Sequence, residues 1–273
     1  MPLRRSSGIL TWLAWVQNGN VEDGIRDFEG AFPDHPPDHS LAKENLMKSS
    51  MTALAVVALA SPAVADFYED ASGDIFDAGL SNLDFLGAEI TNDDTTLFIT
   101  ASLNADLDAT NWGKYLVFID SGEGGAMSGP EGNDPYNNPW GRRVSADVGI
   151  DAFVGSWIDS GGGVLGYLWN GGGWDETSSG APDLSSAGLG MITWSISLDS
   201  LGLSIGSTFS FDLASTGGGG DDPAIDLLST DVVQAGWGNN STSPMAYSYT
   251  VVPTPGVLAL FGLAGLSNRR RRG

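Results

Sequence analysis

The pattern of hydrophobic and polar positions predicts short strands along most of the chain. Within residues 95–103, Leu97, Ile99, Ala101 and Leu103 alternate with Phe98, Thr100 and Ser102, which is mostly the two-residue period of a strand with one buried face. The run 115–120 is apolar almost throughout and predicts a central strand that is buried on both faces. Further segments with strand character are 87–91, 142–158, 164–170, 191–198, 208–214 and 247–252.

Glycine-rich turns separate these segments, and helical periodicity is almost absent. Gly-Gly-Gly runs at 161–163 and 171–173 predict hairpins or loops, and 197–202 predicts a single helical turn. The segment 121–139 predicts a long loop that is mobile or functional. Roughly ten short strands with turns between them favour an all-β fold, a single jelly-roll-like β-sandwich domain over residues 66–252.

Residues 47–65 have the order of parts that defines a secretory signal peptide. Met47-Lys48 begins a basic region, an apolar helix-forming run follows, and Ala63-Val-Ala65 is a signal-peptidase site. Because this signal begins at residue 47, we expect translation to start at Met47 or Met51, with residues 1–46 a mis-assigned or disordered extension. The mature chain would begin at Asp66 and be secreted.

Composition restricts the chemistry of that mature chain. Of 273 residues none is cysteine, and the two histidines, His35 and His39, precede the cleavage site. Catalytic triads that use histidine, zinc sites and haem ligation by histidine are therefore not expected. A net charge of −22 disfavours nucleic acid or an anionic membrane surface as a partner, and suits a soluble secreted protein, a salt-rich habitat or a protein that binds calcium.

The C-terminal segment 253–273 combines Pro253-Thr-Pro255, a short apolar run and the basic residues Arg269, Arg270 and Arg271. An apolar run of about ten residues is shorter than the roughly 20 that a spanning helix needs. The segment resembles the PEP-CTERM sorting signals of Gram-negative bacteria, although Thr254 stands where that family usually has Glu. The resemblance implies a short apolar helix, transient inner-membrane association, an exosortase-type sorting enzyme and delivery to the cell surface or matrix. The alternative is an amphipathic or buried C-terminal helix.

The order of motifs in the mature region carries a second resemblance. Lys114-Tyr115 opens a strand that ends in Ile119-Asp120, and the motifs Trp-Gly-Arg (140–142), Trp-Asn-Gly-Gly-Gly-Trp (169–174) and Ala-Ile-Asp (224–226) follow. This order is similar to the DOMON-like group of β-sandwiches, which includes the family-nine carbohydrate-binding modules. The resemblance implies sugar binding. Haem, which some relatives bind through Met and His, is not carried over because the mature chain has no His.

Tryptophans in loops are the candidate sugar-binding residues. An exposed indole offers a flat apolar face and one N–H donor, which match the C–H face and hydroxyl rim of a pyranose ring. Trp140, Trp174 and Trp237 lie in Gly- and Asn-rich segments, and Trp169 ends a predicted strand. Trp157 and Trp194 alternate with apolar residues and are expected in the core. Arg142 is a candidate partner for an acidic sugar or for a carboxylate of the protein itself.

Carboxylates in loops are candidate calcium ligands, since calcium takes six to eight oxygens. Asp70 and Asp74 flank a Ser-Gly turn, and Asp120 with Glu123 leads into the loop that contains Asp134. A third group, Asp221, Asp222 and Asp226, follows the Gly run 217–220. None has EF-hand spacing, and the alternative is that these acidic loops only solvate the surface.

The sequence as a whole therefore predicts a secreted, non-catalytic protein that binds carbohydrate or exopolysaccharide, with calcium fixing its loops. One alternative is a structural matrix protein without a small ligand. Another is a glycoside hydrolase that uses a carboxylate pair.

Overall fold

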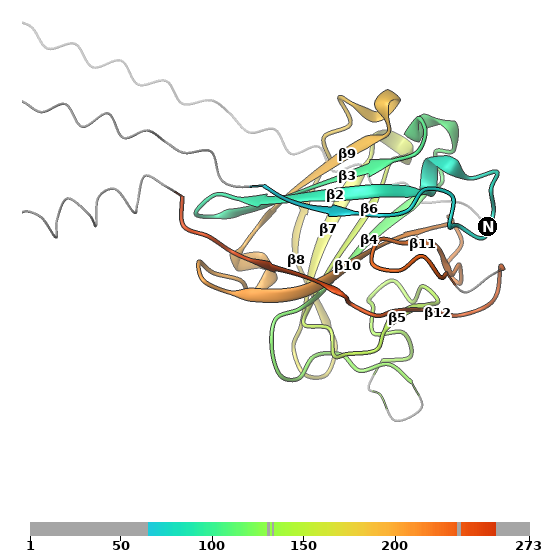
Figure 1. The fold of residues 1–273 in the computed structure, drawn as a ribbon. Coiled ribbons are helices and arrows are strands. Elements are labelled where there is room, and N and C mark those ends of the chain that lie inside the picture. The colour runs from blue at the N-terminus through green and yellow to red at the C-terminus, as the bar shows by residue number, and fades with distance from the viewer. Residues whose placement is uncertain (1–64, 130–131, 133, 234–235, 255–273) are drawn as a thin grey trace, which may run out of the picture. The chain divides into compact units, whose positions relative to one another are not determined.

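A computed structural model describes residues 65–129, 132, 134–233 and 236–254 (Figure 1). These residues form mainly antiparallel β-sheet, which confirms the all-β prediction. The proposed extension, almost all of the signal peptide, and the C-terminal segment from Pro255 onward lie outside the described residues. Within the described part of the chain, no helix has the length and apolarity needed to span a membrane.

The strands are β1 (Asp66–Glu69), β2 (Phe85–Asn92), β3 (Thr96–Leu103), β4 (Lys114–Asp120), β5 (Val144–Ala146), β6 (Ala152–Trp157), β7 (Gly163–Trp169), β8 (Trp174–Gly180), β9 (Met191–Ser197), β10 (Thr208–Thr216), β11 (Ala224–Leu227), β12 (Ser241–Ser243) and β13 (Tyr247–Thr250). Single 3-10 turns are η1 (Ser81–Leu83), η2 (Leu107–Ala109), η3 (Asp159–Gly161), η4 (Ala187–Leu189) and η5 (Asp199–Leu201). The predicted turn at 197–202 is confirmed as η5, which Gly202 ends in the left-handed conformation.

Two sheets carry most of the strands. The four-stranded sheet has the order β1-β2-β3-β9, and the seven-stranded sheet has the order β11-β10-β4-β6-β7-β8, with β13 also paired to β10. A small parallel pair, β5 with β12, makes a third sheet. Strands far apart in the chain, such as β3 and β9, are neighbours in these sheets (Figure 1).

One hydrophobic core joins the inner faces of the two larger sheets. In β3 every second residue is buried, as its alternating sequence predicts, and β9 alternates in the same way. Ile99 of β3 lies opposite Trp194 of β9, and both side chains are fully buried in the same cluster as Val117 of β4. The core position predicted for Trp194 is confirmed.

A second core lies on the other face of the seven-stranded sheet and explains the continuous apolar run of β4. Tyr115, Val117 and Ile119 face the main core, whereas Leu116 and Phe118 pack in the second cluster. That cluster also contains Val144 and Ala146 of β5, Ile150, and Ala224 and Leu227 of β11. β4 is therefore buried on both faces, as predicted.

Two buried asparagines organise the segment between β4 and β6. The Asn137 side chain donates to the carbonyls of Ala146 and Val148, and the Asn138 side chain donates to those of Arg142 and Val144. The prediction of one strand over 142–158 is wrong, because the chain turns at 147–151 between β5 and β6. Ile150, in this turn, pairs with Ala126 in an isolated antiparallel bridge, which ties the turn to the loop after β4.

Candidate functional site: an aromatic row and an aspartate cluster

The register of β6, β7 and β8 places aromatic side chains on one face of the seven-stranded sheet. Residues directly opposite each other in antiparallel strands share a face. Phe153 pairs with Tyr167, and Trp169 pairs with Trp174, so all four point to the face that bears the second core. β8 is the last strand of this sheet, so the face ends at an edge strand beside Trp174.

These rings form a continuous series, which we call the aromatic row: Trp140, Trp157, Tyr167, Trp169 and Trp174 around the buried Phe153. Ring centroids are 6.1 Å apart between Trp157 and Trp140, and 5.4 Å apart between Trp169 and Trp174. Phe153 lies 5.9 Å from Trp140, 6.1 Å from Tyr167 and 6.4 Å from Trp174, and thus connects the two ends. The five outer rings are partly exposed, whereas Phe153 is fully buried.

Two glycines let indole rings lie against the strands. A Cβ at Gly155 of β6 would be 2.2 Å from the Trp140 ring, and one at Gly163 of β7 would be 2.1 Å from the Trp157 ring. Any side chain at these positions would push the ring away from the sheet. The absence of side chains at Gly155 and Gly163 therefore sets the positions of Trp140 and Trp157.

The N–H groups of two indoles of the row donate hydrogen bonds to protein acceptors. Trp140 Nε1 donates to the Tyr167 hydroxyl over 3.3 Å, and Trp174 Nε1 donates to Asp134 Oδ2 over 3.1 Å. Glu176 of β8 lies opposite Tyr167 and is exposed on the same face. The row thus combines partly exposed ring faces with carboxylate acceptors, which can stack on a sugar and accept bonds from its hydroxyls.

Trp237 and Arg142, both predicted as sugar-binding residues, lie outside the aromatic row. Trp237 is 49% exposed and packs edge-on against Phe76 with a centroid distance of 5.1 Å, so it does not join the aromatic row. Arg142 lies 6.0 Å from the Trp140 ring, is only 7% exposed, and donates to the Gly217 carbonyl over 3.1 Å. These contacts hold the Arg142 side chain between the Trp140 ring and the Gly217 backbone.

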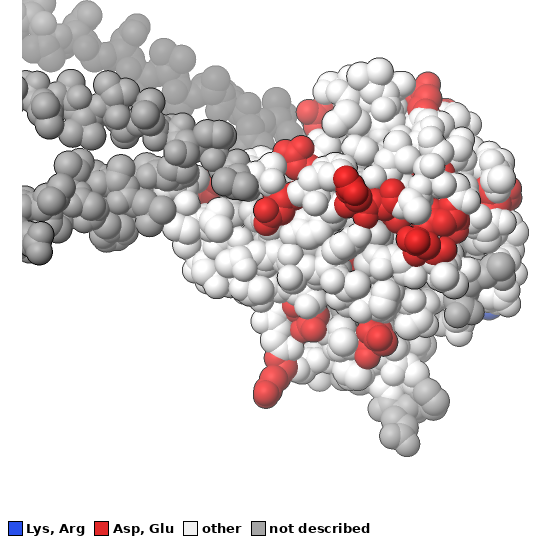
Figure 2. All heavy atoms as spheres, in the orientation of Figure 1, with Lys and Arg blue, Asp and Glu red and all other residues white. Residues whose placement is uncertain are grey.

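Five aspartates from three segments converge at another place, which we call the aspartate cluster. Carboxylate oxygens of Asp74, Asp84 and Asp226 lie within 4.8 Å of one another, and so do those of Asp70, Asp74 and Asp231. Asp70, Asp74 and Asp84 lie between β1 and β2. Asp226 belongs to β11, and Asp231 follows β11. Figure 2 shows acidic side chains gathered on one face of the molecule, where almost no Lys or Arg is visible.

Backbone contacts hold the two most buried members in place. Asp84 is 1% exposed and accepts from the Gly73 N–H at 3.1 and 2.9 Å and from the Asn104 side chain at 2.8 Å. Asp226 is fully buried and accepts from the Phe85 N–H at 2.6 Å. Because Phe85 begins β2 and Asp226 lies in β11, the cluster spans both larger sheets.

Asp70 and Asp74 have fewer donors, and only Asp70 Oδ1 accepts one, from the Ala71 N–H. Both Asp74 oxygens and Asp70 Oδ2 are buried without a hydrogen-bond partner. Burial, together with repulsion from neighbouring aspartates, raises the pKa of Asp70 to about 9 and that of Asp226 to about 8. The pKa of Asp74 is also raised, chiefly by burial. The site therefore disfavours its own negative charge unless a cation or protons compensate.

The second predicted group of metal ligands is not brought together among the described residues. Asp120 Oδ1 accepts from Gly122 N–H, Glu123 is exposed, and Asp134 binds the N–H groups of Tyr136 and Trp174. In the third group, Asp222 accepts from Gly219 N–H while Asp226 joins the aspartate cluster. Trp157, expected in the core, is partly exposed. Asp84 and Asp231 were not predicted as ligands, because they lie outside the strands and only the folded chain brings them close to Asp74.

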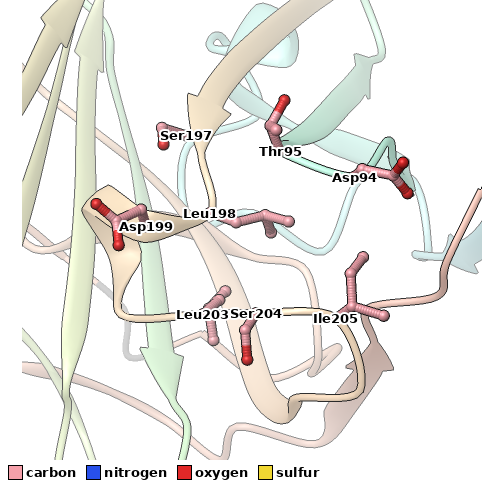
Figure 3. Close-up of a pocket in the computed structure, with 8 residues that line it drawn as sticks. All are labelled: Asp94, Thr95, Ser197, Leu198, Asp199, Leu203, Ser204 and Ile205. Carbon is pink, nitrogen blue, oxygen red and sulfur yellow. The ribbon is translucent and has the colours of Figure 1, made fainter.

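An open hollow of about 460 Å³ lies elsewhere, lined by Asp94, Thr95, Ser197, Leu198, Asp199, Leu203, Ser204 and Ile205 (Figure 3). Asp94 and Asp199 lie at opposite ends of it. Asp94 Oδ1 accepts from both the N–H and the hydroxyl of Thr254, at 3.0 and 2.7 Å. The residue between the two prolines of the predicted sorting motif is therefore tied to the loop before β3.

No protein-family model matches this chain, and no curated protein matches it in sequence.

Proposed function

We propose that this chain is a secreted, non-catalytic protein whose two larger sheets form a jelly-roll-like β-sandwich, and that it binds polysaccharide through the aromatic row. In this proposal the signal at 47–65 exports the chain, with cleavage after Ala65. The segment 253–273 then directs it to the cell surface or matrix through an exosortase-type enzyme, after transient membrane association.

The observation that supports binding is the aromatic row itself. Five partly exposed rings lie over one face of β6, β7 and β8, as two packed pairs and Tyr167 connected through the buried Phe153, and this packing fixes their orientation. A site whose rings are already ordered loses little side-chain entropy when a sugar stacks on them. A row of rings also suits a chain of sugars better than a single one.

The charges around the row favour a neutral polysaccharide. Asp134 and Glu176 lie beside it, Arg142 next to Trp140 is buried, and Lys114, opposite Trp157, is paired with Asp159. An acidic polymer would be repelled by these carboxylates and by the overall charge of −22. We therefore expect glucan-type polymers to bind more tightly than polymers of uronic acids.

The test is affinity electrophoresis of the purified chain in gels that contain a neutral or an acidic polysaccharide. Trp174→Ala and Trp169→Ala should each weaken retardation by at least about tenfold, the loss typical of a central aromatic contact. Trp112→Ala removes an exposed tryptophan outside the row and should bind like wild type. Thermal unfolding of each variant shows whether the loss is one of binding or of folding.

Absence of retardation by every polymer would contradict the binding proposal and favour a structural matrix protein. Retardation that survives both substitutions would contradict the site. The proposed processing is tested separately by mass spectrometry of the secreted protein, which should begin at Asp66. Recovery of peptides from residues 1–46 in secreted material would contradict the proposed start site.

A further inference from the structure

The aspartate cluster has an excess of negative charge that no described side chain balances. Only three cationic residues, Lys114, Arg142 and Arg143, occur between residues 65 and 254. Lys114 pairs with Asp159 at 2.8 Å, Arg143 lies 4.0 Å from Asp221, and Arg142 binds the Gly217 carbonyl. Burying uncompensated carboxylates is costly, so the cluster as described is electrostatically incomplete.

A second, independent observation concerns hydrogen bonds rather than charge. Each oxygen of the Asp74 carboxylate has less than 1 Å² of exposed surface and accepts no hydrogen bond from another residue. Buried polar atoms in folded proteins are almost always partnered, so two free oxygens on one carboxylate require an explanation. The Asp74 carboxylate lies within 4.8 Å of oxygens from Asp84 and Asp226, whose side chains are 1% and 0% exposed.

We propose that Asp74, Asp84 and Asp226 bind a calcium ion, and that Asp70 and Asp231 add negative charge on its outer side. Calcium lies 2.3–2.6 Å from its oxygen ligands, so two ligands on opposite sides of one ion are about 4.8 Å apart. The spacing of the three carboxylates is compatible with one such ion. The contacts that Gly73, Asn104 and Phe85 make with Asp84 and Asp226 would orient these ligands.

The ligand atoms select the class of metal. All of them are carboxylate oxygens, which suit hard cations, whereas zinc and copper favour nitrogen or sulfur ligands. Magnesium demands a near-ideal octahedron and keeps several waters. A site with two carboxylates from the segment before β2 and one from β11 gives an irregular shell, which calcium tolerates better.

The position of the site indicates what the ion would do. Asp74 lies in the segment between β1 and β2, and Asp226 lies in β11 at the edge of the seven-stranded sheet. An ion between them would clamp this segment onto β11, beside the Phe76–Trp237 contact. The aromatic row shares no residue with this site, so sugar binding and calcium binding can fail independently.

The test is thermal unfolding of the purified full chain, first with chelator and then with about 10 mM calcium, which exceeds the constants of weak extracellular sites. At a concentration about 100-fold above the dissociation constant, the midpoint should rise by about 5 to 10 °C. Asp74→Asn keeps the size of the side chain and should remove most of this rise. Asp77→Asn, in the same segment but outside the cluster, should keep it in full.

Three results would overturn the proposal. The first is a midpoint that calcium does not change. The second is an equal rise in Asp74→Asn, which would place calcium at other surface carboxylates. The third is an equal rise with the same concentration of magnesium, which would contradict the assignment to calcium.

Discussion

Asp212 and Asp74 are buried aspartate carboxylates in neighbouring parts of this protein, and their surroundings differ sharply. Asp212, in β10, is fully buried and accepts from Leu213 N–H, from the N–H and hydroxyl of Ser229, and from the Ser243 hydroxyl. Asp74 accepts none, although both its oxygens are buried. One carboxylate has all its partners within the chain, and the other lies among further carboxylates.

The two sites differ in how many hydrogen-bond donors the chain supplies to a buried carboxylate. At Asp212 four donors offset part of the cost of burial, and its pKa still rises to about 6. At the aspartate cluster the described residues supply donors only to Asp84 and Asp226 and to one oxygen of Asp70. A partner from outside the chain is therefore expected at Asp74 and not at Asp212. Four changes to these two sites test the difference.

The largest effect is expected for Asp212→Ala. The substitution leaves two N–H groups and two hydroxyls without their acceptor in a fully buried place, which should lower the free energy of unfolding by about 3 to 5 kcal/mol. Urea unfolding measures the loss, and it should be the same with calcium and with chelator. A loss below about 1 kcal/mol would contradict a partnered role for Asp212.

The next effect is a dependence of stability on pH. The pKa of Asp212 is raised by burial from 3.8 to about 6, so the folded state holds this proton more tightly than the unfolded state. Its contribution to stability is full below about pH 4 and is lost as pH rises to about 6, amounting to at most about 3 kcal/mol. Urea unfolding across this range isolates the contribution as the difference between wild type and Asp212→Asn. Parallel curves for the two proteins would refute it.

A smaller effect of opposite sign is expected for Asp74→Asn in chelator. Removing one negative charge from a buried place lowers its desolvation cost and relieves repulsion with Asp84 and Asp231, which should raise the free energy of unfolding by about 1 kcal/mol. In calcium the same variant should be less stable than wild type. The reversal is measured by paired urea titrations at pH 8, and a variant less stable than wild type in both conditions would contradict it.

The smallest effect is expected for Ser229→Ala, which removes one of the four donors to Asp212. The N–H of Ser229 still donates, so the loss should be about 1 kcal/mol, the contribution of a single hydrogen bond. Thermal unfolding measures it, with Ser178→Ala as a control outside the Asp212 site. A loss as large as that of Asp212→Ala would show that the donors act as one network.

Much of the β-structure could be predicted because its signals are local. β3 and β9 alternate, and β4 is continuously apolar, so periodicity alone locates them. β8 was missed because an exposed edge strand carries charged and small polar residues that look like a loop, and β11 is too short to show a period.

The candidate sites depend on contacts between distant residues, so the sequence located them only in part. Asp70 and Asp74 were nominated by their spacing around a turn, but Asp84 and Asp226 join them only because Asp226 binds the start of β2. Trp140, Trp169 and Trp174 were nominated from their glycine-rich surroundings. Trp157 joins them because its ring packs over Gly163 and reaches Trp140 across the sheet.

The most direct test of the difference between the two aspartate sites is equilibrium dialysis that counts calcium ions bound per chain. Wild type, Asp74→Asn and Asp212→Asn are compared at a calcium concentration that saturates wild type. We expect one tightly held ion in wild type and in Asp212→Asn, and its loss in Asp74→Asn. Equal binding by wild type and Asp74→Asn, or no tightly held ion in wild type, would contradict it.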